Sequence, residues 1–287
     1  MENTSSPFIF TVDVEDWFTN GRTIKIEEWG NYKLRVERNV EKLLYLLDKT
    51  QQKGTFFVLG WIAKQLPLLI KRIHQHGHEI ASHGYAHELV YRQKPHIFRK
   101  DVRNAKIVLE DLIGEQVLGY RAPCFSITPW AIDILQQEGY VYDSSIALNT
   151  WRRTYEPEMH IISNNHFIEI RNQFYEFMLP FRRIGSYTIP LGGGGYFRLY
   201  PYFIYKRMLY HISQIPFVFY IHPYELDVRH PRYWSTNIME NVRMYYGVHS
   251  TYQKLEHLLS AFPFTTMRSY YDAFLRNSNN IKWFTEF

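Results

Sequence analysis

The chain has 287 residues, of which 46% are hydrophobic and 21% are charged, so it is long enough to bury one large core. Its 33 basic and 28 acidic side chains leave a formal net charge of +5, and no block of Lys or Arg stands out, which argues against a nucleic-acid-binding protein. Cys124 is the single cysteine, which excludes an internal disulfide and a cysteine-based zinc cluster.

The first residues, MENTSSPFIFTVDVEDWF, lack the basic start and long apolar run of a secretory signal. No apolar stretch in the sequence approaches the length needed to span a membrane. We therefore expect a protein of the cytoplasm without a transmembrane segment. A position at the surface of the inner membrane, where lipid-linked sugars are found, is a further conjecture. The sequence does not indicate an oligomeric state.

Short apolar runs alternate with segments of helical period, a pattern typical of repeated β-α units and a largely parallel sheet. The first predicted strand is Phe8–Val12, and the helix after it carries Val36, Val40, Leu43, Leu44 and Leu47 on one face. Further strands are predicted at Thr55–Leu59, His78–Ala81, Val117–Tyr120, Tyr140–Tyr142, Phe217–Ile221 and around Phe264–Met267. Further helices are predicted at about Pro67–His74, Ile97–Leu112, Pro129–Gln137, Pro201–Ser213 and Tyr252–Phe262.

The β-α rhythm loosens between about residues 149 and 195, which we interpret as strands and loops. The chain shows no internal repeat, no low-complexity linker and no sharp shift of composition. We therefore predict one domain over residues 1–287, with a motif core at about 8–225 and a C-terminal extension at about 226–287.

Polar residues cluster directly after five of the predicted strands. Parallel barrels keep their active sites on the loops at the carboxyl ends of their strands, so we expect these clusters to meet. The five clusters are Asp13-Val14-Glu15-Asp16, Ser82-His83-Gly84-Tyr85-Ala86-His87, Arg121-Ala122-Pro123-Cys124-Phe125, Tyr142-Asp143-Ser144-Ser145 and Ile221-His222-Pro223.

The first two clusters combine carboxylates with a pair of histidines four residues apart. Such oxygen and imidazole donors suit Zn²⁺ or another divalent first-row metal. Taken alone, an acidic strand end is more often a helix cap, and His83 and His87 would be two unrelated surface histidines. Taken together, they leave room for a water molecule whose pKa the metal lowers toward neutrality, with a second carboxylate as its base.

In their order along the chain, the five clusters resemble the motifs of polysaccharide deacetylases of carbohydrate esterase family four, the NodB-homology proteins. The resemblance covers roughly residues 8 to 225. It implies a distorted (β/α)7 barrel of the TIM-like type that removes N-acetyl groups from an N-acetylated sugar or glycan by metal-dependent hydrolysis. It also implies a divalent metal, which we expect to be Zn²⁺, with Co²⁺ or Ni²⁺ as alternatives.

The resemblance also assigns catalytic roles to residues of this chain. Asp13 is implied as the base, and Arg121 as the residue that orients it. The backbone N–H of Cys124 is implied as a donor to the oxyanion. Asp143 is implied to support the imidazole of His222, which acts as general acid toward the leaving amine.

The metal ligands implied by the resemblance are His83, His87 and one acidic residue of the first cluster. That cluster departs from the usual Thr-Phe-Asp-Asp-Gly of the family, so the acidic ligand is not fixed by alignment. Strand alternation places Glu15 on the same face as Asp13, whereas a kink at the end of the strand would aim Asp16 at the metal. We favour Asp16, with Glu15 close behind.

The variant first cluster, together with Leu191-Gly192-Gly193-Gly194-Gly195-Tyr196-Phe197-Arg198 and His222-Pro223-Tyr224-Glu225, resembles a subgroup found in bacterial exopolysaccharide and surface-glycan loci. The substrate class, lipid-linked glycans included, is inferred from that likeness. Consecutive glycines let a ligand approach the backbone closely, and a flexible turn explains them equally well. Substrate contacts are expected among Trp17, Phe18, Tyr85, Phe125, Trp151, Gly194 and Tyr196, although most of these rings belong to the core.

Two other functions remain open from the sequence. The same scaffold could hydrolyse another small amide or a formamide if its loops differ. A homologue that binds glycans without turnover would keep the site and release no acetate.

Overall fold

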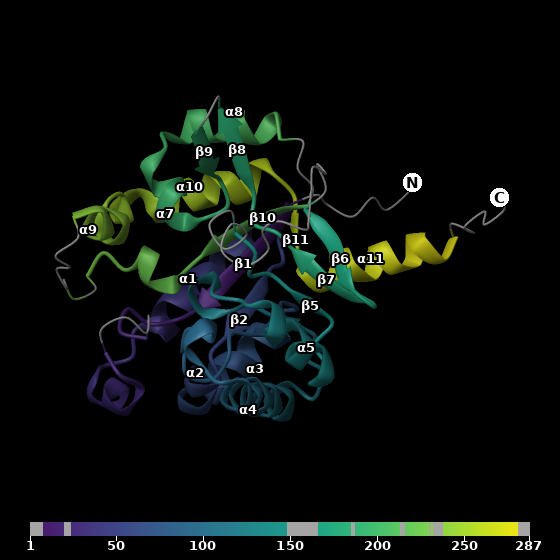
Figure 1. Ribbon diagram of the computed structural model, residues 1–287. Helices are drawn as coiled ribbons and strands as arrows, with labels where there is room; N and C mark the ends of the chain where they lie inside the picture. The colour runs from purple at the N-terminus through teal and green to yellow at the C-terminus, as the bar shows by residue number, and fades with distance from the viewer. Residues whose placement is uncertain are drawn as a thin grey trace.

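The computed structural model describes residues 8–19, 24–147, 166–184, 187–212, 216–229, 231 and 238–280. Within them, nine strands form one curled sheet that is surrounded by helices (Figure 1). These strands are β1 (Phe8–Val14), β2 (Thr55–Val58), β3 (Glu79–Ser82), β4 (Gly119–Tyr120), β5 (Tyr142–Asp143), β6 (Phe167–Arg171), β7 (Phe174–Phe177), β10 (Phe217–Ile221) and β11 (Phe264–Thr265).

Seven of the strands run parallel in the order β10-β1-β2-β3-β4-β5-β7, which confirms the predicted distorted (β/α)7 barrel. Beyond them, β6 lies antiparallel to β7, and β11 pairs with the first residues of β1. Backbone outside these strands extends the hydrogen bonding at two places. The backbone N–H of Leu191 donates to the carbonyl of Pro180 at 3.0 Å, and the N–H of Tyr220 donates to the carbonyl of Gly192 at 2.7 Å.

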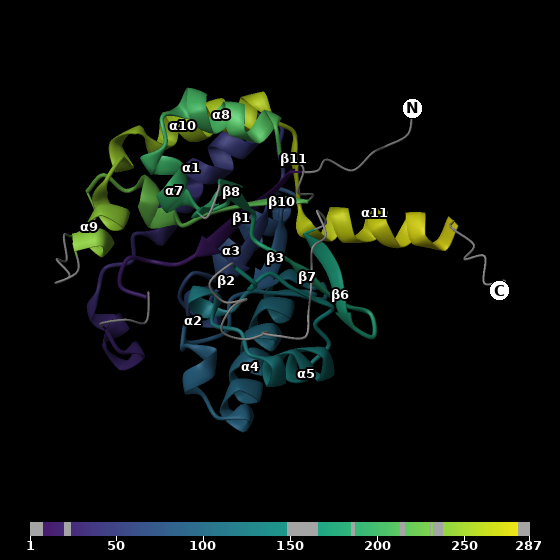
Figure 2. The same cartoon turned by 45° about the horizontal axis from the view of Figure 1, so that its top comes forward.

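Helices cover both flanks of the sheet, as Figure 2 shows. On one flank lie α2 (Gly60–Gln65), α3 (Pro67–Gln75), α4 (Pro95–Ile113) and α5 (Pro129–Gln137). On the other flank lie α1 (Val36–Lys49), α7 (Gly194–Leu199), α8 (Tyr202–Tyr210) and α10 (Val248–Ala261). The remaining elements are the short sheet of β8 (Phe181–Ile184) and β9 (Tyr187–Pro190), α9 (Ile238–Tyr245), and α11 (Met267–Asn280), which extends away from the barrel.

The strand β1 shows why this sequence forms a central parallel strand. All seven of its residues are buried, as expected for a strand covered on both faces. Phe10 of β1 stacks on Phe219 of β10 with ring centroids 5.6 Å apart, so neighbouring strands also pair through their side chains. The core-facing stripe predicted for α1 is buried, and α5 and β10 have the predicted bounds.

The sequence-based prediction misses α2, α7, α9 and α11. The six residues of α2 are too few to show a helical period. The predicted last strand is only two residues long, and α11 begins at Met267. Rings of α11 pack against the sheet; for example, Phe274 lies 5.0 Å from Phe167. Among the described residues, no helix combines the length and the apolar character needed to cross a membrane. The single-domain organisation stays a prediction.

The carboxyl group of Glu79 joins the start of α11 to the sheet. It accepts hydrogen bonds from the Thr55 hydroxyl at 2.6 Å and from the Arg268 backbone N–H at 2.9 Å, and the Tyr142 hydroxyl also donates to it. Burial raises the pKa of Glu79 to about 7, because these donors compensate only part of the lost hydration.

We expect this carboxyl to make the stability of the protein fall as pH rises. The folded state keeps the Glu79 proton to higher pH than the unfolded chain, so its contribution is full below about pH 4.5 and is lost through about pH 7. In Glu79→Gln, the decrease in the free energy of unfolding between pH 5 and pH 8 should shrink by on the order of 1–3 kcal/mol. Urea unfolding at several pH values measures this, and equal pH slopes in both proteins would contradict it.

Candidate active site

The carboxyl edge of the barrel brings residues from five strand ends together. Asp13 lies in β1, His83 follows β3, Arg121 follows β4, Asp143 ends β5 and His222 follows β10. Four of them are buried, and the side chain of His222 is 19% exposed. A small molecule can therefore reach the imidazole while the charged groups behind it are shielded from water.

Three side chains converge on one point. The Glu15 Oε1 atom lies 2.9 Å from His83 Nε2 and 2.9 Å from His87 Nε2. All three residues are buried, and their ligand atoms lie within 4.8 Å of one another. The His83 Nδ1 atom faces the carbonyl of Arg121 at 2.7 Å, which fixes the ring and directs Nε2 toward Glu15.

These donors fit a divalent metal ion. With Nδ1 donating to a carbonyl, His83 offers the lone pair of Nε2, and ligand atoms about 2 Å from one ion lie roughly 3–3.5 Å apart. Burial opposes the charge of Glu15, but the positive charge of His87 and the two histidine hydrogen bonds outweigh it and hold the pKa well below its usual value. Two imidazoles and one carboxylate form a donor set suited to Zn²⁺.

Asp16, which the sequence analysis favours as the acidic metal ligand, does not join this group in the structure. Its Oδ2 atom accepts the backbone N–H groups of Arg35 at 2.5 Å and Val36 at 2.8 Å, and its Oδ1 atom accepts that of Trp17 at 2.9 Å. Asp16 therefore caps the N-terminus of α1, whose own N-cap residue Arg35 makes no side-chain cap.

Arg121 holds Asp13 in place. Its Nη1 atom donates to Asp13 Oδ1 at 2.7 Å and to the Thr11 hydroxyl at 2.8 Å, and its other donors bind the hydroxyl and carbonyl of Ser144. The guanidinium is fully buried and lies 4.1 Å from the ring centroid of Phe57. One oxygen of Asp13 is thus occupied by a permanent cation.

The imidazole of His222 faces the carboxylates of Asp13 and Glu15. Its Nε2 atom lies 3.8 Å from Asp13 Oδ2 and 4.0 Å from Glu15 Oε1. Tyr224 stacks on the imidazole with ring centroids 4.9 Å apart. A reacting group between Asp13 and His222 would therefore have a carboxylate on one side and an imidazole on the other.

The partner of His222 is Glu225, a residue to which the sequence analysis gives no role. The Glu225 Oε1 atom lies 2.9 Å from His222 Nδ1 and also accepts the backbone N–H of His222 at 3.0 Å. Its Oε2 atom accepts Arg198 Nε at 2.9 Å, and both side chains of that pair are 2% exposed. The clusters His222–Glu225 and Leu191–Arg198 are the sequence signal that could have revealed it.

Arg198, Glu225 and His222 form a row of alternating charges, and each charge stabilises its neighbour. Burial alone would lower the pKa of His222, but the hydrogen bond to Glu225 and the charges of Glu15, Glu225 and Asp13 raise it to about 9. Burial alone would raise the pKa of Glu225, but Arg198 and His222 lower it to about 2. An ion pair between His222 and Glu225 is therefore stable at neutral pH.

Asp143, which the family resemblance implies as the support of His222, makes no hydrogen bond or ion pair with His222 in the structure. Its Oδ1 atom accepts the Ser145 hydroxyl at 2.6 Å, and its carboxyl group lies beside that of Glu176. Burial raises the pKa of Asp143 to about 6, and burial and the charge of Asp143 raise that of Glu176 well above its usual value. Glu176 in turn accepts the backbone N–H of Ile146, so this pair organises the loop after β5.

The loop after β4 contains two successive residues in the left-handed region, Cys124 with φ of 51° and Phe125 with φ of 56°. Neither is glycine, so this backbone costs on the order of 1–2 kcal/mol per residue. Strained loops of this kind collect at functional sites, where the strain aims a backbone group. Cys124 itself is exposed.

The residues predicted to contact the substrate differ in their burial and in the rings that they pack against. Trp17 packs edge-on against Tyr32 at 5.4 Å, and Phe125 packs against Tyr220 at 5.0 Å. The ring of Tyr85 fills the space beside α2, because a Cβ atom on Gly60 would lie 2.6 Å from it. Phe18 is buried, Tyr196 is half-buried and Gly194 is buried, whereas Trp151 lies outside the described residues.

A Cβ atom on Gly194 would lie 2.6 Å from both carboxylate oxygens of Glu225. Similarly, Gly192 has no room for a Cβ beside the carbonyl of Val218, and Gly193 has none beside the hydroxyl of Tyr220. Close packing of the backbone accounts for these three glycines.

The fold and this edge define a parallel β/α barrel with a candidate metal centre, and two family models match the chain. Residues 30–142 match the polysaccharide deacetylase model, and residues 145–272 match a domain of unknown function, DUF3473. A peptidoglycan deacetylase-like protein of Gibberella zeae is 36% identical over 111 residues, which are 38% of this chain and 32% of that protein. The chain spans between about a third and two-fifths of the length of the curated relatives it matches.

Solved structures share the fold, and two of them serve as examples. A candidate polysaccharide deacetylase from Mycobacterium smegmatis superposes with a TM-score of 0.64 at 18% identity, over 97% of this chain and 93% of that one. A CE4 family pseudoenzyme from Bacillus anthracis superposes with a TM-score of 0.52 at 11% identity, over 95% of this chain and 67% of that one. The chain is thus similar to polysaccharide deacetylases over residues 30–142, and it shares its fold with these two structures.

We expect substitutions of the neighbouring residues Glu15 and Asp16 to have different effects, one on metal binding and the other on stability. Glu15→Gln should weaken Zn²⁺ binding by about 100-fold or more, since even the loss of a residue that supports a ligand weakens binding by 10- to 100-fold. Asp16→Ala should keep Zn²⁺ affinity near that of the wild type and lower the free energy of unfolding by about 1–3 kcal/mol, because three backbone N–H groups lose their acceptor.

Chelator competition measures the affinity, and urea unfolding of the metal-free proteins measures the stability. A loss of Zn²⁺ affinity in Asp16→Ala with unchanged unfolding would restore Asp16 as the ligand.

Proposed function

We propose that the protein is a metal-dependent carbohydrate N-deacetylase that hydrolyses acetamide groups of an N-acetylated sugar or glycan. The observation that carries this proposal is the convergence of Asp13, His222 and the Glu15-His83-His87 group on one space. The match of residues 30–142 to the polysaccharide deacetylase model supports the reaction class.

The metal in this proposal is Zn²⁺, with Co²⁺ or Ni²⁺ as alternatives, held by Glu15, His83 and His87. When bound, it would polarise the acetamide carbonyl and lower the pKa of a water molecule. The protein residues supply the proton transfers and the orientation. Asp13 Oδ2, the oxygen not bound by Arg121, takes the proton of the attacking water.

The backbone N–H of Cys124 is proposed as a donor to the developing oxyanion. His222 gives its Nε2 proton to the leaving amine. Its raised pKa keeps that proton available at neutral pH, and Glu225 holds the opposite ring nitrogen. Arg198 positions Glu225 without touching the reacting atoms. Trp17, Phe125 and Tyr196 are proposed to meet the sugar at the rim of the site.

The more specific proposals, on the identity of the substrate and on the location in the cell, rest on the family resemblance. We propose a glycan of exopolysaccharide or surface-glycan synthesis as the substrate, lipid-linked glycans included, and a single domain over residues 1–287. Action in the cytoplasm beside the inner membrane stays a prediction.

Acetate release from N-acetylated oligosaccharides tests the reaction. Chelated protein should release no acetate, added Zn²⁺, Co²⁺ or Ni²⁺ should restore release, and His83→Ala should stay inactive with every metal. Asp13→Asn should lower kcat by about 10²- to 10⁴-fold while the protein keeps its fold, because the base is lost. An active Asp13→Asn protein would overturn the mechanism. Sugar binding without acetate release under any metal would identify a glycan-binding homologue, and release from other amides alone would change the substrate class.

Glu225→Gln tests the general acid. The amide keeps the shape of the side chain and removes its charge, so the pKa of His222 should fall and the alkaline limb of kcat should move to lower pH. At pH 8 we expect kcat to drop roughly tenfold. Asp143→Asn is the matched control, because Asp143 makes no contact with His222; an equal shift of the limb in Asp143→Asn alone would return the supporting role to Asp143.

A further inference from the structure

The outer face of α8 has a composition unlike that of a normal surface helix. Phe203 is 73% exposed, Ile204 is 40% exposed and Tyr210 is 62% exposed, and they recur at helical spacing on the face turned away from the barrel. The inner face buries Tyr205 and Leu209. The helix is therefore apolar on both sides, which is the mark of a surface that meets a partner.

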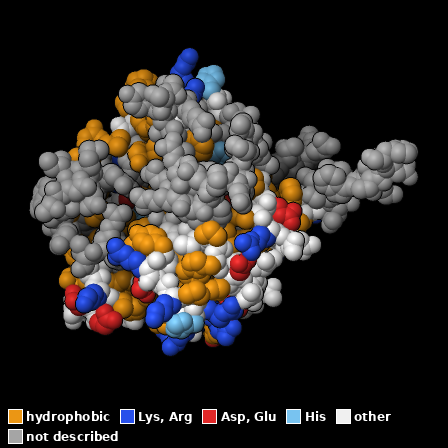
Figure 3. All heavy atoms as spheres, viewed as in Figure 1, with side chains coloured by type: hydrophobic (Ala, Val, Ile, Leu, Met, Phe, Trp, Pro, Cys, Tyr) orange, Lys and Arg blue, Asp and Glu red, His pale blue; other side chains and the backbone are white. Residues whose placement is uncertain are grey.

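The same helix carries positive charge and no acidic residue. Lys206 and Arg207 lie in the middle of its sequence, Tyr-Phe-Ile-Tyr-Lys-Arg-Met-Leu-Tyr. Arg207 is exposed on the outer face, and Lys206 Nζ lies 5.8 Å from the ring centroid of Tyr210. Figure 3 shows hydrophobic side chains beside Lys, Arg and His side chains at the top of the molecule, over α8. Such a mixture of aromatic rings and cations is typical of surfaces that enter the headgroup layer of a membrane.

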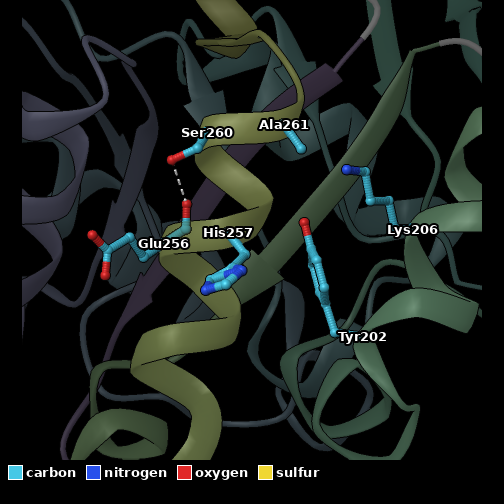
Figure 4. Close-up of a pocket in the computed structure, with 6 residues that line it drawn as sticks. All are labelled: Tyr202, Lys206, Glu256, His257, Ser260 and Ala261. Atoms are coloured by element: carbon cyan, nitrogen blue, oxygen red, sulfur yellow. Dashed lines mark hydrogen bonds between the residues drawn. The ribbon is translucent and has the colours of Figure 1, made fainter.

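A groove of about 470 Å³ runs beside this face, between α8 and α10 (Figure 4). Tyr202 and Lys206 point into it from α8, and His257 points into it from α10. The Tyr202 hydroxyl is buried and has no hydrogen-bond partner within the part of the chain that the structure describes. Glu256 is the acidic residue of the groove; it points away from Lys206 and pairs with Lys49 at 2.5 Å. A hydroxyl, an ammonium group and an imidazole are donors suited to a phosphate.

We propose that the outer face of α8 and the groove beside α10 form a docking surface for a bilayer that contains anionic lipids. Phe203, Ile204 and Tyr210 enter the headgroup layer, Arg207 lies against the anionic surface, and the groove receives a lipid phosphate. Charge complementarity favours this occupant over a second copy of the chain, because two such faces would bring Lys206 and Arg207 of each copy together. The proposal is independent of the proposed reaction and holds whether or not acetate is released.

Sedimentation of the full chain with vesicles tests this surface. We expect binding to vesicles of phosphatidylcholine and phosphatidylglycerol, weaker binding as salt rises, and little binding to phosphatidylcholine alone. Phe203→Ser combined with Tyr210→Ser should weaken binding by roughly tenfold or more, because two rings no longer leave water. Lys206→Glu combined with Arg207→Glu should abolish the preference for anionic vesicles.

Leu68→Ser is the matched control, because Leu68 is 70% exposed on α3, on the other flank of the barrel. This variant should bind vesicles like the wild type, and thermal unfolding should show that all variants are folded. No binding to anionic vesicles, or equal binding by the wild type and both α8 variants, would overturn the proposal. So would light scattering that shows a dimer in the wild type and a monomer in the Phe203→Ser, Tyr210→Ser protein, since the face would then meet a second copy.

Discussion

The buried guanidinium of Arg121 is the interaction on which the carboxyl edge of the barrel depends. A cation removed from water costs several kcal/mol unless its donors are all satisfied. Arg121 is fully buried, and its donors bind Asp13 and Thr11 of β1 and Ser144 after β5. Its own carbonyl faces Nδ1 of His83. One residue thus fixes the orientation of the proposed base and of a proposed metal ligand, and the strand ends must lie where they satisfy it.

The support of His222 shows how a local change can preserve the chemistry of a site. The family resemblance implies a carboxylate from another strand, Asp143, whereas this chain supplies Glu225 from the turn that follows His222 itself. A carboxylate three residues away needs its own buried counter-ion, which is Arg198 of α7. It also needs space, and Gly194 at the start of α7 provides it because no side chain fits there. The glycine-rich cluster and the histidine cluster therefore form one packing unit.

The sequence could predict the parallel barrel and the edge at which the site lies, because both follow from local periods and from the convergence of parallel strand ends. It could not decide between Glu15 and Asp16. That choice depends on the backbone N–H groups at the start of α1, near Arg35, which lie close to Asp16 only after folding. Strand alternation alone favoured Glu15. The helix α11 was a missed signal, because Tyr270, Tyr271 and Phe274 recur at helical spacing, and its rings pack on the sheet at Phe167.

The three carboxylates that face His222 differ in their counter-ions, and this difference separates their proposed roles. Asp13 is paired with Arg121, and Glu225 is paired with Arg198. An arginine stays charged at every relevant pH and offers no lone pair, so it orients a carboxylate without competing for a metal ion. Among the described residues, the ion pairs of Glu15 are with imidazoles alone. Imidazoles can release a proton and become ligands, so Glu15 is the carboxylate of the three whose surroundings can accept a divalent cation.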